Sequence, residues 1–344
     1  MHMADALISP AVGGTLWVAT AGLIGYCSKK VKQDLDDKKI PLMGVIGAFI
    51  FAAQMINFTI PATGSSGHLG GGMILAILLG PYAAFLTMAS VLTVQALFFA
   101  DGGLLALGCN IFNLGFFPCF ICYPLIYKSI VKDTPSSGAI MTGALLSAVL
   151  GLQMGAFSVV LETFFSGISE LPFTAFVMLM QPIHLAIGLV EGVTTAAVVM
   201  FVWKSRPEMM TASISHGTGR GYFIGRVLAG FIIATVVVGG ALSWFASSRP
   251  DGLEWAMFKT SGSEELAAPE KGIHSSLAGI QEKTAFLPDY GFKTAEPPAG
   301  EEPAETWPSV NPGTSVSGLV GGLLTLCLAV LIGFIIKQRK ASRT

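Results

Sequence analysis

Long apolar runs, separated by short charged stretches, limit most strongly what this chain can fold into. Only 12% of its 344 residues are charged, whereas apolar residues make up 52% and the mean hydropathy is +0.68. A soluble domain needs about 25% charged residues to cover its surface. The sequence therefore predicts an all-α polytopic membrane protein. The net charge of −1 gives no indication of a nucleic-acid partner.

Charged residues divide the chain into nine apolar segments. Most of these have the ~20 residues that a helix needs to cross the hydrocarbon core. The segment 69–80 is shorter and ends at Gly80-Pro81, so it is predicted to be a short or half-inserted helix packed inside protein. The nine predicted spans are 9–28, 40–58, 69–80, 82–100, 104–127, 137–163, 173–203, 222–246 and 317–336.

Lysine and arginine in the short loops predict the orientation, because cytoplasmic loops carry an excess of these residues. An external N-terminus places all of them inside, and the remaining cations then lie in one long outer loop. The sequence predicts nine crossings, with the N-terminus outside and the C-terminus in the cytoplasm. The inside cations are Lys29, Lys30, Lys32, Lys38, Lys39, Lys128, Lys132, Lys204, Arg206, Arg220, Arg226, Lys337, Arg339, Lys340 and Arg343.

Two parts are predicted along the chain. Residues 1–207 form a seven-span bundle, and residues 208–344 form a two-span hairpin that begins with a polar cytoplasmic linker. An external loop, about 247–313, joins the two spans of the hairpin. This loop is acidic and rich in proline, so it is predicted to be only partly ordered. Loops of this length are uncommon without a function of their own.

The chain starts Met1-His2-Met3, and a free amino terminus followed by histidine is a metal chelator. The Met1 amine, the His2 amide nitrogen and a His2 ring nitrogen can close two fused chelate rings in one plane. Square-planar nitrogen donors suit Ni(II), Cu(II) and, less well, Co(II). His68, within the glycine-rich segment 64–72 on the same predicted face, can supply a fourth nitrogen. The alternatives are a polar residue at a frayed terminus and a surface histidine in a flexible loop.

Polar side chains within the predicted spans should face the bundle interior. Asn57, Gln95 and Asp101 lie towards the outer side and are candidates to hydrogen-bond the free ring nitrogen of a ligating histidine. Hydrogen bonding between helices is the alternative role for each. His184 and Glu191, two helical turns apart, are interpreted as either a transit site or a structural hydrogen-bonded pair, and the structural role is favoured.

With these motifs, the chain resembles the fused substrate-binding and accessory component of cobalt/nickel energy-coupling-factor transporters. The likeness covers the first 205 or so residues, where Ala6 replaces a more usual glycine. The residues 247–255 resemble the signature that opens the external loop of the nickel-type accessory component. The similar stretches of the first part are Met1 to Leu7, Phe51 to Met55 with Asn57, Gly67-His68-Leu69, Gln95 to Gly103, Asn110, Asn113, His184, Gly188 and Glu191-Gly192.

The resemblance implies that Met1, His2 and His68 ligate a transported Ni²⁺ or Co²⁺ at the outer face of a prokaryotic cytoplasmic membrane. No permanently bound cofactor is expected. The resemblance also implies that the loop near Pro250 to Trp255 reshapes the pocket, and that the ATPase and a coupling membrane subunit are separate chains. The sequence has no G-x-x-x-x-G-K-S/T motif, so no enzymatic activity is expected. A stand-alone metal-gated channel or membrane metal sensor is the alternative function.

Overall fold

The computed structural model describes residues 2–34, 39–132, 135–207, 225–293 and 307–341. The chain is an all-α polytopic membrane protein with one short antiparallel ribbon, in which β1 (Phe58–Thr59) pairs with β2 (Ser66–Gly67). Six helices in these described ranges are long and apolar enough to cross a membrane, and two shorter apolar helices accompany them. The nine predicted apolar segments each fall on a helix of the structure.

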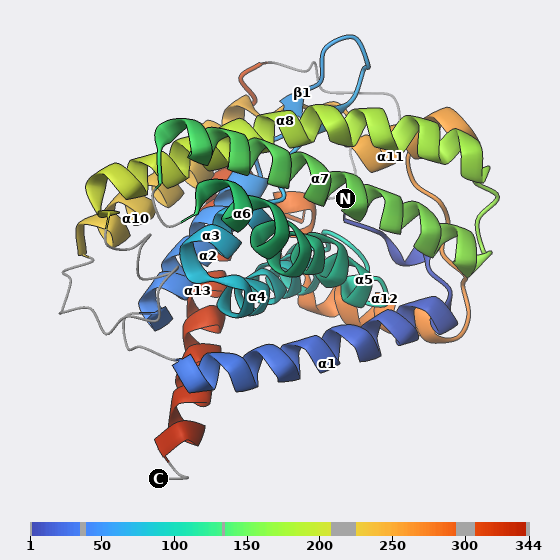
Figure 1. The fold of residues 1–344 in the computed structure, drawn as a ribbon. Coiled ribbons are helices and arrows are strands. Elements are labelled where there is room, and N and C mark those ends of the chain that lie inside the picture. The colour runs from blue at the N-terminus through green and yellow to red at the C-terminus, as the bar shows by residue number, and fades with distance from the viewer. Residues whose placement is uncertain (1, 35–38, 133–134, 208–224, 294–306, 342–344) are drawn as a thin grey trace.

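The helices follow the two predicted parts of the chain (Figure 1). The first part contains η1 (Asp5–Leu7), α1 (Pro10–Asp34), α2 (Lys39–Gln54), α3 (Gly72–Leu79), α4 (Pro81–Phe99), α5 (Leu107–Ile111), η2 (Phe112–Tyr127), α6 (Lys128–Val131), α7 (Ser137–Ser166) and α8 (Phe173–Ser205). The second part contains α10 (Gly225–Gly240), η3 (Leu242–Phe245), α11 (Gly252–Ser261), α12 (Ile273–Thr284), η4 (Pro288–Tyr290) and α13 (Pro312–Ala341).

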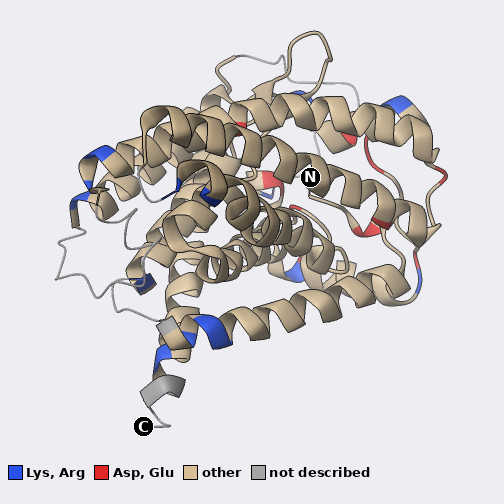
Figure 2. Ribbon diagram, viewed as in Figure 1, with Lys and Arg blue, Asp and Glu red and all other residues tan. Residues whose placement is uncertain are grey.

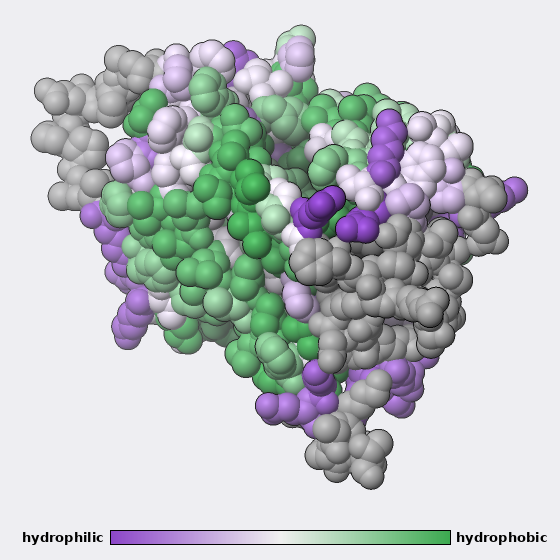
Figure 3. Space-filling model, turned by 90° about the vertical axis from the view of Figure 1, so that its left-hand side faces the viewer, coloured by the Kyte–Doolittle hydropathy of each residue, from purple (hydrophilic) through white to green (hydrophobic). Residues whose placement is uncertain are grey.

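Charge separates the two ends of the bundle. Most Lys and Arg gather at the left and lower left of Figure 2, at the ends of α1, α8, α10 and α13, whereas Asp and Glu lie mainly on the other side. Between these ends the surface is largely apolar, and Figure 3 shows a broad hydrophobic area with hydrophilic residues at its margins. An apolar belt between polar ends is the surface expected of a helical protein in a bilayer.

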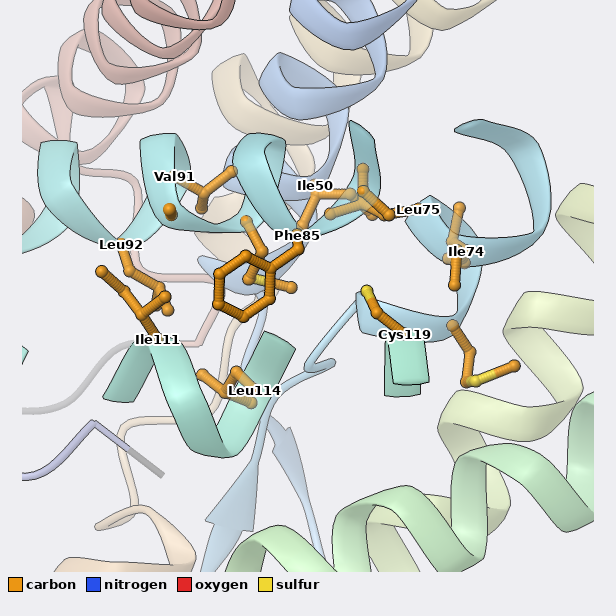
Figure 4. Packing of buried hydrophobic residues seen from close by; sticks show 14 of the residues in the cluster. Ile50, Ile74, Leu75, Phe85, Val91, Leu92, Ile111, Leu114 and Cys119 are labelled. Atoms are coloured by element: carbon orange, nitrogen blue, oxygen red, sulfur yellow. The ribbon is translucent and has the colours of Figure 1, made fainter. Parts of the chain in front are cut away.

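The core lies where α3, α4 and η2 meet (Figure 4). Phe85, Ile74 and Leu114 are among its buried side chains. The segment η2 is a wide, π-type helix that contains Pro118 and Pro124. Proline has no N–H for the regular helical hydrogen bond, and a wider turn accommodates this loss.

The short predicted segment 69–80 forms α3, whose eight residues are all buried. At 1.5 Å per residue, eight residues rise only ~12 Å, less than half of a hydrocarbon core of ~30 Å. Gly71, immediately before α3, has φ +75°, a left-handed conformation that glycine adopts without strain. A short helix of this kind leaves room on its N-terminal side for a loop within the bundle.

The described part of the external loop is folded more than the sequence predicts. It contains α11 and α12, and Asp251 begins α11 with a capping box in which its side chain accepts from the N–H of Glu254. The Glu254 side chain in turn accepts from the Asp251 N–H, at 2.8 Å. A capping box of this type stabilises a helix start. Acidity and proline content alone did not reveal these local signals.

Glycines allow α7 and α8 to pack closely. A Cβ atom at Gly192 would lie 2.6 Å from the Leu145 Cα, and one at Gly188 would lie 2.9 Å from the Val149 Cα. These are backbone atoms that a side-chain rotation cannot move away. Small residues at such contacts let membrane helices approach each other.

We expect Gly192→Ala to lower the thermal stability of the purified protein, because overpacking typically costs about 1–3 kcal/mol. Gly22→Ala on α1 is the matched control, since a Cβ there meets nothing within 4 Å. Alanine also has the higher helix propensity, so the control should unfold at the same or a slightly higher temperature. Equal melting temperatures for the two variants in a thermal-shift assay would contradict this account of the α7–α8 contact.

Candidate metal site

The N-terminal segment enters the bundle and is held there through the backbone of Met3. The Met3 N–H donates to Asn110 Oδ1 at 2.8 Å, and Asn110 Nδ2 donates to the Met3 carbonyl at 3.2 Å. The Gly103 N–H also donates to that carbonyl, at 2.9 Å. A Cβ at Gly103 would lie 1.9 Å from Asp5 Oδ1, so only glycine permits this approach. The backbone next to His2 is therefore fixed from two sides.

The His2 ring lies inside the protein, and its side chain is only 7% exposed. Its Nδ1 lies 3.2 Å from Asp101 Oδ1, and its Nε2 is buried without a hydrogen-bond partner among the described residues. The ring stacks on His68, with the centroids 5.0 Å apart and the planes 6° from parallel. Metal–imidazole bonds measure about 2.0–2.1 Å for zinc, so two rings at this separation can reach one ion.

His68 follows β2 and is oriented by its own backbone. Its Nδ1 lies 3.1 Å from the Leu69 carbonyl, which can only accept, so Nδ1 carries the proton and Nε2 has the free lone pair. Burial lowers the pKa of His68 to about 3, and the neighbouring His2 ring lowers it further. The ring is therefore neutral at physiological pH, which is the form that binds metals.

The glycine loop after His68 is anchored to two helices. Glu191 on α8 accepts from the N–H of Gly70 at 2.7 Å and of Gly71 at 3.1 Å. Gln54 Nε2 on α2 donates to the Gly70 carbonyl at 2.8 Å, and Gln95 Nε2 donates to Gln54 Oε1 at 2.9 Å. These contacts fix the loop at the N-terminal end of α3, where a carboxylate also interacts favourably with the helix dipole.

Asp101 connects His2 to the second part of the chain. The Tyr290 hydroxyl donates to Asp101 Oδ2, on the other side of the carboxylate from His2. Burial opposes ionisation of Asp101, but the His2 ring and the Tyr290 hydroxyl hold its pKa below the usual range. Burial and the Asp101 charge raise the pKa of Tyr290 well above its ordinary value, so Tyr290 remains a donor.

The second part of the chain covers this region from the outer side. Ser66 on β2 donates its N–H to the Pro250 carbonyl at 2.8 Å, and its hydroxyl to the Arg249 carbonyl at 2.7 Å. Asp251 lines a small cavity together with His68 and His184. The signature that begins the external loop therefore lies against the strand that leads to His68.

The predicted site residues are placed in three ways. Met1 lies outside the described residues. His2, His68 and Asp101 lie together, whereas Gln95 reaches the His68 loop only through Gln54. Asn57 joins the two parts, because its carbonyl accepts from the Ser247 N–H at 2.7 Å, and within the described chain no hydrogen bond links its side chain to either histidine.

His184 and Glu191 do not bond to each other, because each has another partner. His184 Nδ1 lies 2.8 Å from the Met180 carbonyl of its own helix, and the Glu191 carboxylate holds Gly70 and Gly71. Both contacts are structural, but the predicted pairing was wrong. The described residues contain no group of three or more His, Cys, Asp or Glu side chains that could hold a metal. A metal site here therefore requires backbone nitrogen donors.

Sequence reasoning missed two contributors. Tyr290 was not considered, and Asn110 was considered only as a contact between helices. Tyr290 and Asp101 are 189 positions apart, so no local pattern connects them. The Asp289-Tyr290-Gly291 stretch does carry a turn signal, because Asp and Gly favour turns.

Comparison with known proteins agrees with the two-part organisation. The family model CbiM, described as a cobalt uptake substrate-specific transmembrane region, matches residues 2–209, and a PDGLE domain matches residues 225–338. A putative fused nickel transport protein, NikMN of Archaeoglobus fulgidus, is 30% identical over 338 residues, covering 95% of this chain and 96% of that protein. The fused nickel transport protein NikMN of Rhodobacter capsulatus is 29% identical over 84% of this chain and 88% of its own.

A solved structure shares the fold of the first part. It is described as a transition metal transporter, is 28% identical, and superposes with a TM-score of 0.54 over 64% of this chain and 100% of its own. The CbiM match covers more than half of the chain, and the relative from Archaeoglobus fulgidus extends over both parts. The chain therefore belongs to the family of cobalt uptake substrate-specific transmembrane proteins, in a form fused to a PDGLE domain, as its sequence motifs indicated.

Proposed function

We propose that this protein captures Ni²⁺ or Co²⁺ at the outer face of a prokaryotic cytoplasmic membrane, as the substrate-specific component of an energy-coupling-factor transporter. The observation that carries the proposal is the stacked pair of His2 and His68, with ring centroids 5.0 Å apart. The names of the relatives as nickel and cobalt transport proteins support the same class of cargo. The nickel-type signature of the external loop favours nickel.

In the proposed coordination, the ion has four nitrogen ligands: the Met1 amine, the His2 amide, a His2 ring nitrogen and the His68 ring. The free lone pair of His68 is on Nε2. A six-membered chelate ring from the His2 amide requires Nδ1, which in the metal-free geometry faces Asp101 at 3.2 Å. We therefore propose that the His2 ring makes a half-turn when metal binds. Nδ1 then faces the ion, and Nε2 moves to the edge of the ring next to Asp101.

The donor set explains which ions are excluded. Mg²⁺ and Ca²⁺ prefer oxygen ligands, so an all-nitrogen site rejects them. Cu²⁺ is favoured by the affinity series, so selectivity against copper comes from elsewhere in the protein or the cell. The amide nitrogen binds only after it loses its proton. Metal capture therefore releases protons, and the affinity rises with pH.

The proposed topology has nine crossings, with the N-terminus outside and the C-terminus inside. The concentration of Lys and Arg at one end of the bundle supports it (Figure 2). Separate ATPase and coupling membrane subunits supply the energy. Glu191 offers a mechanical link to the site, because movement of α8 acts directly on the Gly70-Gly71 backbone that follows His68. We propose that this link helps to release the ion inwards.

We expect acetylation or extension of the N-terminus to abolish high-affinity Ni²⁺ and Co²⁺ binding, because the amine donor and its chelate ring are lost. Isothermal titration of protein with an untagged N-terminus provides the reference. Thermal stability should be largely retained, since Asn110 holds Met3 rather than Met1. An extended protein that binds Ni²⁺ as tightly as the native one would refute the amine-ligand model.

His68→Ala should weaken Ni²⁺ binding by more than the about 10- to 100-fold that follows loss of an outer-shell partner. The Ni²⁺ absorption spectrum should change as well, because one planar donor is removed. His274→Ala is the matched control: this buried histidine bonds to the Ile8 carbonyl at 2.9 Å and lies outside the proposed ligand set. An unchanged spectrum in His68→Ala would remove His68 from the site.

Proton release distinguishes the amide from His68 as its source. The pKa of His68, about 3, means that this ring binds metal without losing a proton above about pH 5. Titrations in buffers of different ionisation enthalpy should therefore give the same proton release for the native protein and for His68→Ala at saturating metal. A large decrease in the variant would assign the proton to His68 instead.

Uptake into vesicles tests the transport function itself. Reconstituted with its ATPase and coupling subunits, the protein should accumulate radioactive ⁶³Ni²⁺ only when ATP is hydrolysed. A stand-alone channel is the alternative, and it would pass the ion without the ATPase. A rate of entry that is independent of ATP and of the partner subunits would overturn the proposed function.

A further inference from the structure

The accessory part of the chain reaches the histidine pair through one side chain, that of Tyr290. This residue belongs to η4, which follows α12 in the described part of the external loop. Asp101 lies between the two, with one carboxylate oxygen near His2 Nδ1 and the other accepting from the Tyr290 hydroxyl. The three side chains form a continuous hydrogen-bonded series from the external loop to the candidate site.

The position of Tyr290 is fixed by its ring and its backbone. The ring stacks on Phe99 of α4, with centroids 5.1 Å apart and planes 18° from parallel, and its edge approaches Phe51 of α2. Asp289 and Tyr290 have φ values of 49° and 57°, in the left-handed region that non-glycine residues seldom adopt. Such backbone strain persists only where the surroundings enforce it, and it concentrates at functional sites.

Contacts on either side hold the turn against the first part. Gln281 Nε2 on α12 donates to the Gly102 carbonyl at 2.8 Å and to the Ala96 carbonyl at 2.9 Å. The Leu287 N–H donates to the Phe98 carbonyl at 3.3 Å. The second part therefore binds both ends of the short segment that carries Asp101.

We propose that Tyr290 is a positioning residue for metal capture: its hydroxyl holds the Asp101 carboxylate in the orientation that directs the His2 ring towards the ion. This inference rests on the proposed function. Asp101 is 23% exposed, so without the Tyr290 hydroxyl its carboxylate can turn towards water and release His2. A histidine ligand depends on a hydrogen-bond partner of this kind for the orientation of its ring. Capture is then efficient only while the η4 turn is docked.

The role of Tyr290 differs from that of a ligand. Tyr290 does not contact the proposed donors, and it acts on His2 only through Asp101. Because the same carboxylate bonds His2 and Tyr290, undocking of the external loop and loosening of His2 are linked events. The accessory part therefore takes part in setting the affinity, as well as covering the site.

Tyr290→Phe in the full-length protein with an untagged N-terminus tests the proposal. Phenylalanine retains the ring and its stacking on Phe99 while removing the hydroxyl. We expect Ni²⁺ affinity to fall about tenfold, the lower end of the range for outer-shell partners. The Ni²⁺ absorption band should shift, and the melting temperature of the metal-free protein should stay close to the native value. Tyr26→Phe, a hydroxyl removal on α1 that leaves these contacts intact, is the control and should bind as the native protein does.

A double-mutant cycle separates positioning from packing. If Tyr290 acts through Asp101, Tyr290→Phe should add little to the loss caused by Asp101→Asn, because the shared link is already broken. Fully additive losses would show that Tyr290 acts by another route and would overturn the proposal. Unchanged affinity and spectrum in Tyr290→Phe, with tight binding by the native protein, would also overturn it. Failure of the native protein to bind Ni²⁺ would instead contradict the proposed function on which this inference rests.

Discussion

The two-point hydrogen bonding of Asn110 to the Met3 backbone is the interaction on which the candidate site depends. It satisfies the N–H and the carbonyl of one residue with one amide side chain, inside a bundle where an unpaired backbone group is costly. Without it, the start of the chain would behave like most termini, which are poorly ordered. With it, the His2 ring is brought to the His68 ring.

The site is assembled from elements that are distant in the sequence. His2 comes from the start of the chain, His68 from the loop before α3, and Asp101 from the loop after α4. The short length of α3 makes this possible, because a helix of eight residues leaves the outer part of the bundle to a loop. Glycines provide the close approaches, as at Gly103, where any side chain would collide with Asp5. Rigid helices thus support a site that is made mostly of loops.

Several expectations from the sequence agree with the structure, and their differences have physical causes. Hydropathy located the apolar helices because burial in lipid demands long uncharged runs. It did not identify α11 and α12, because their order depends on capping and on docking against the bundle rather than on hydropathy. Glu191 was paired with His184 on helical spacing, but the nearby N–H groups of Gly70 and Gly71 compete more effectively for a buried carboxylate.

The sequence by itself determined the membrane class, the apolar helices and the residues that can chelate a metal. These follow from local composition and from the chemistry of a histidine next to a free amine. Only the tertiary structure decided which of the polar candidates meet: Asp101 lies beside His2, Gln95 is one residue removed, and Asn57 joins the two parts of the chain. Contacts such as that of Tyr290 with Asp101 depend on how helices pack, and packing between distant segments leaves no periodic pattern in a single sequence.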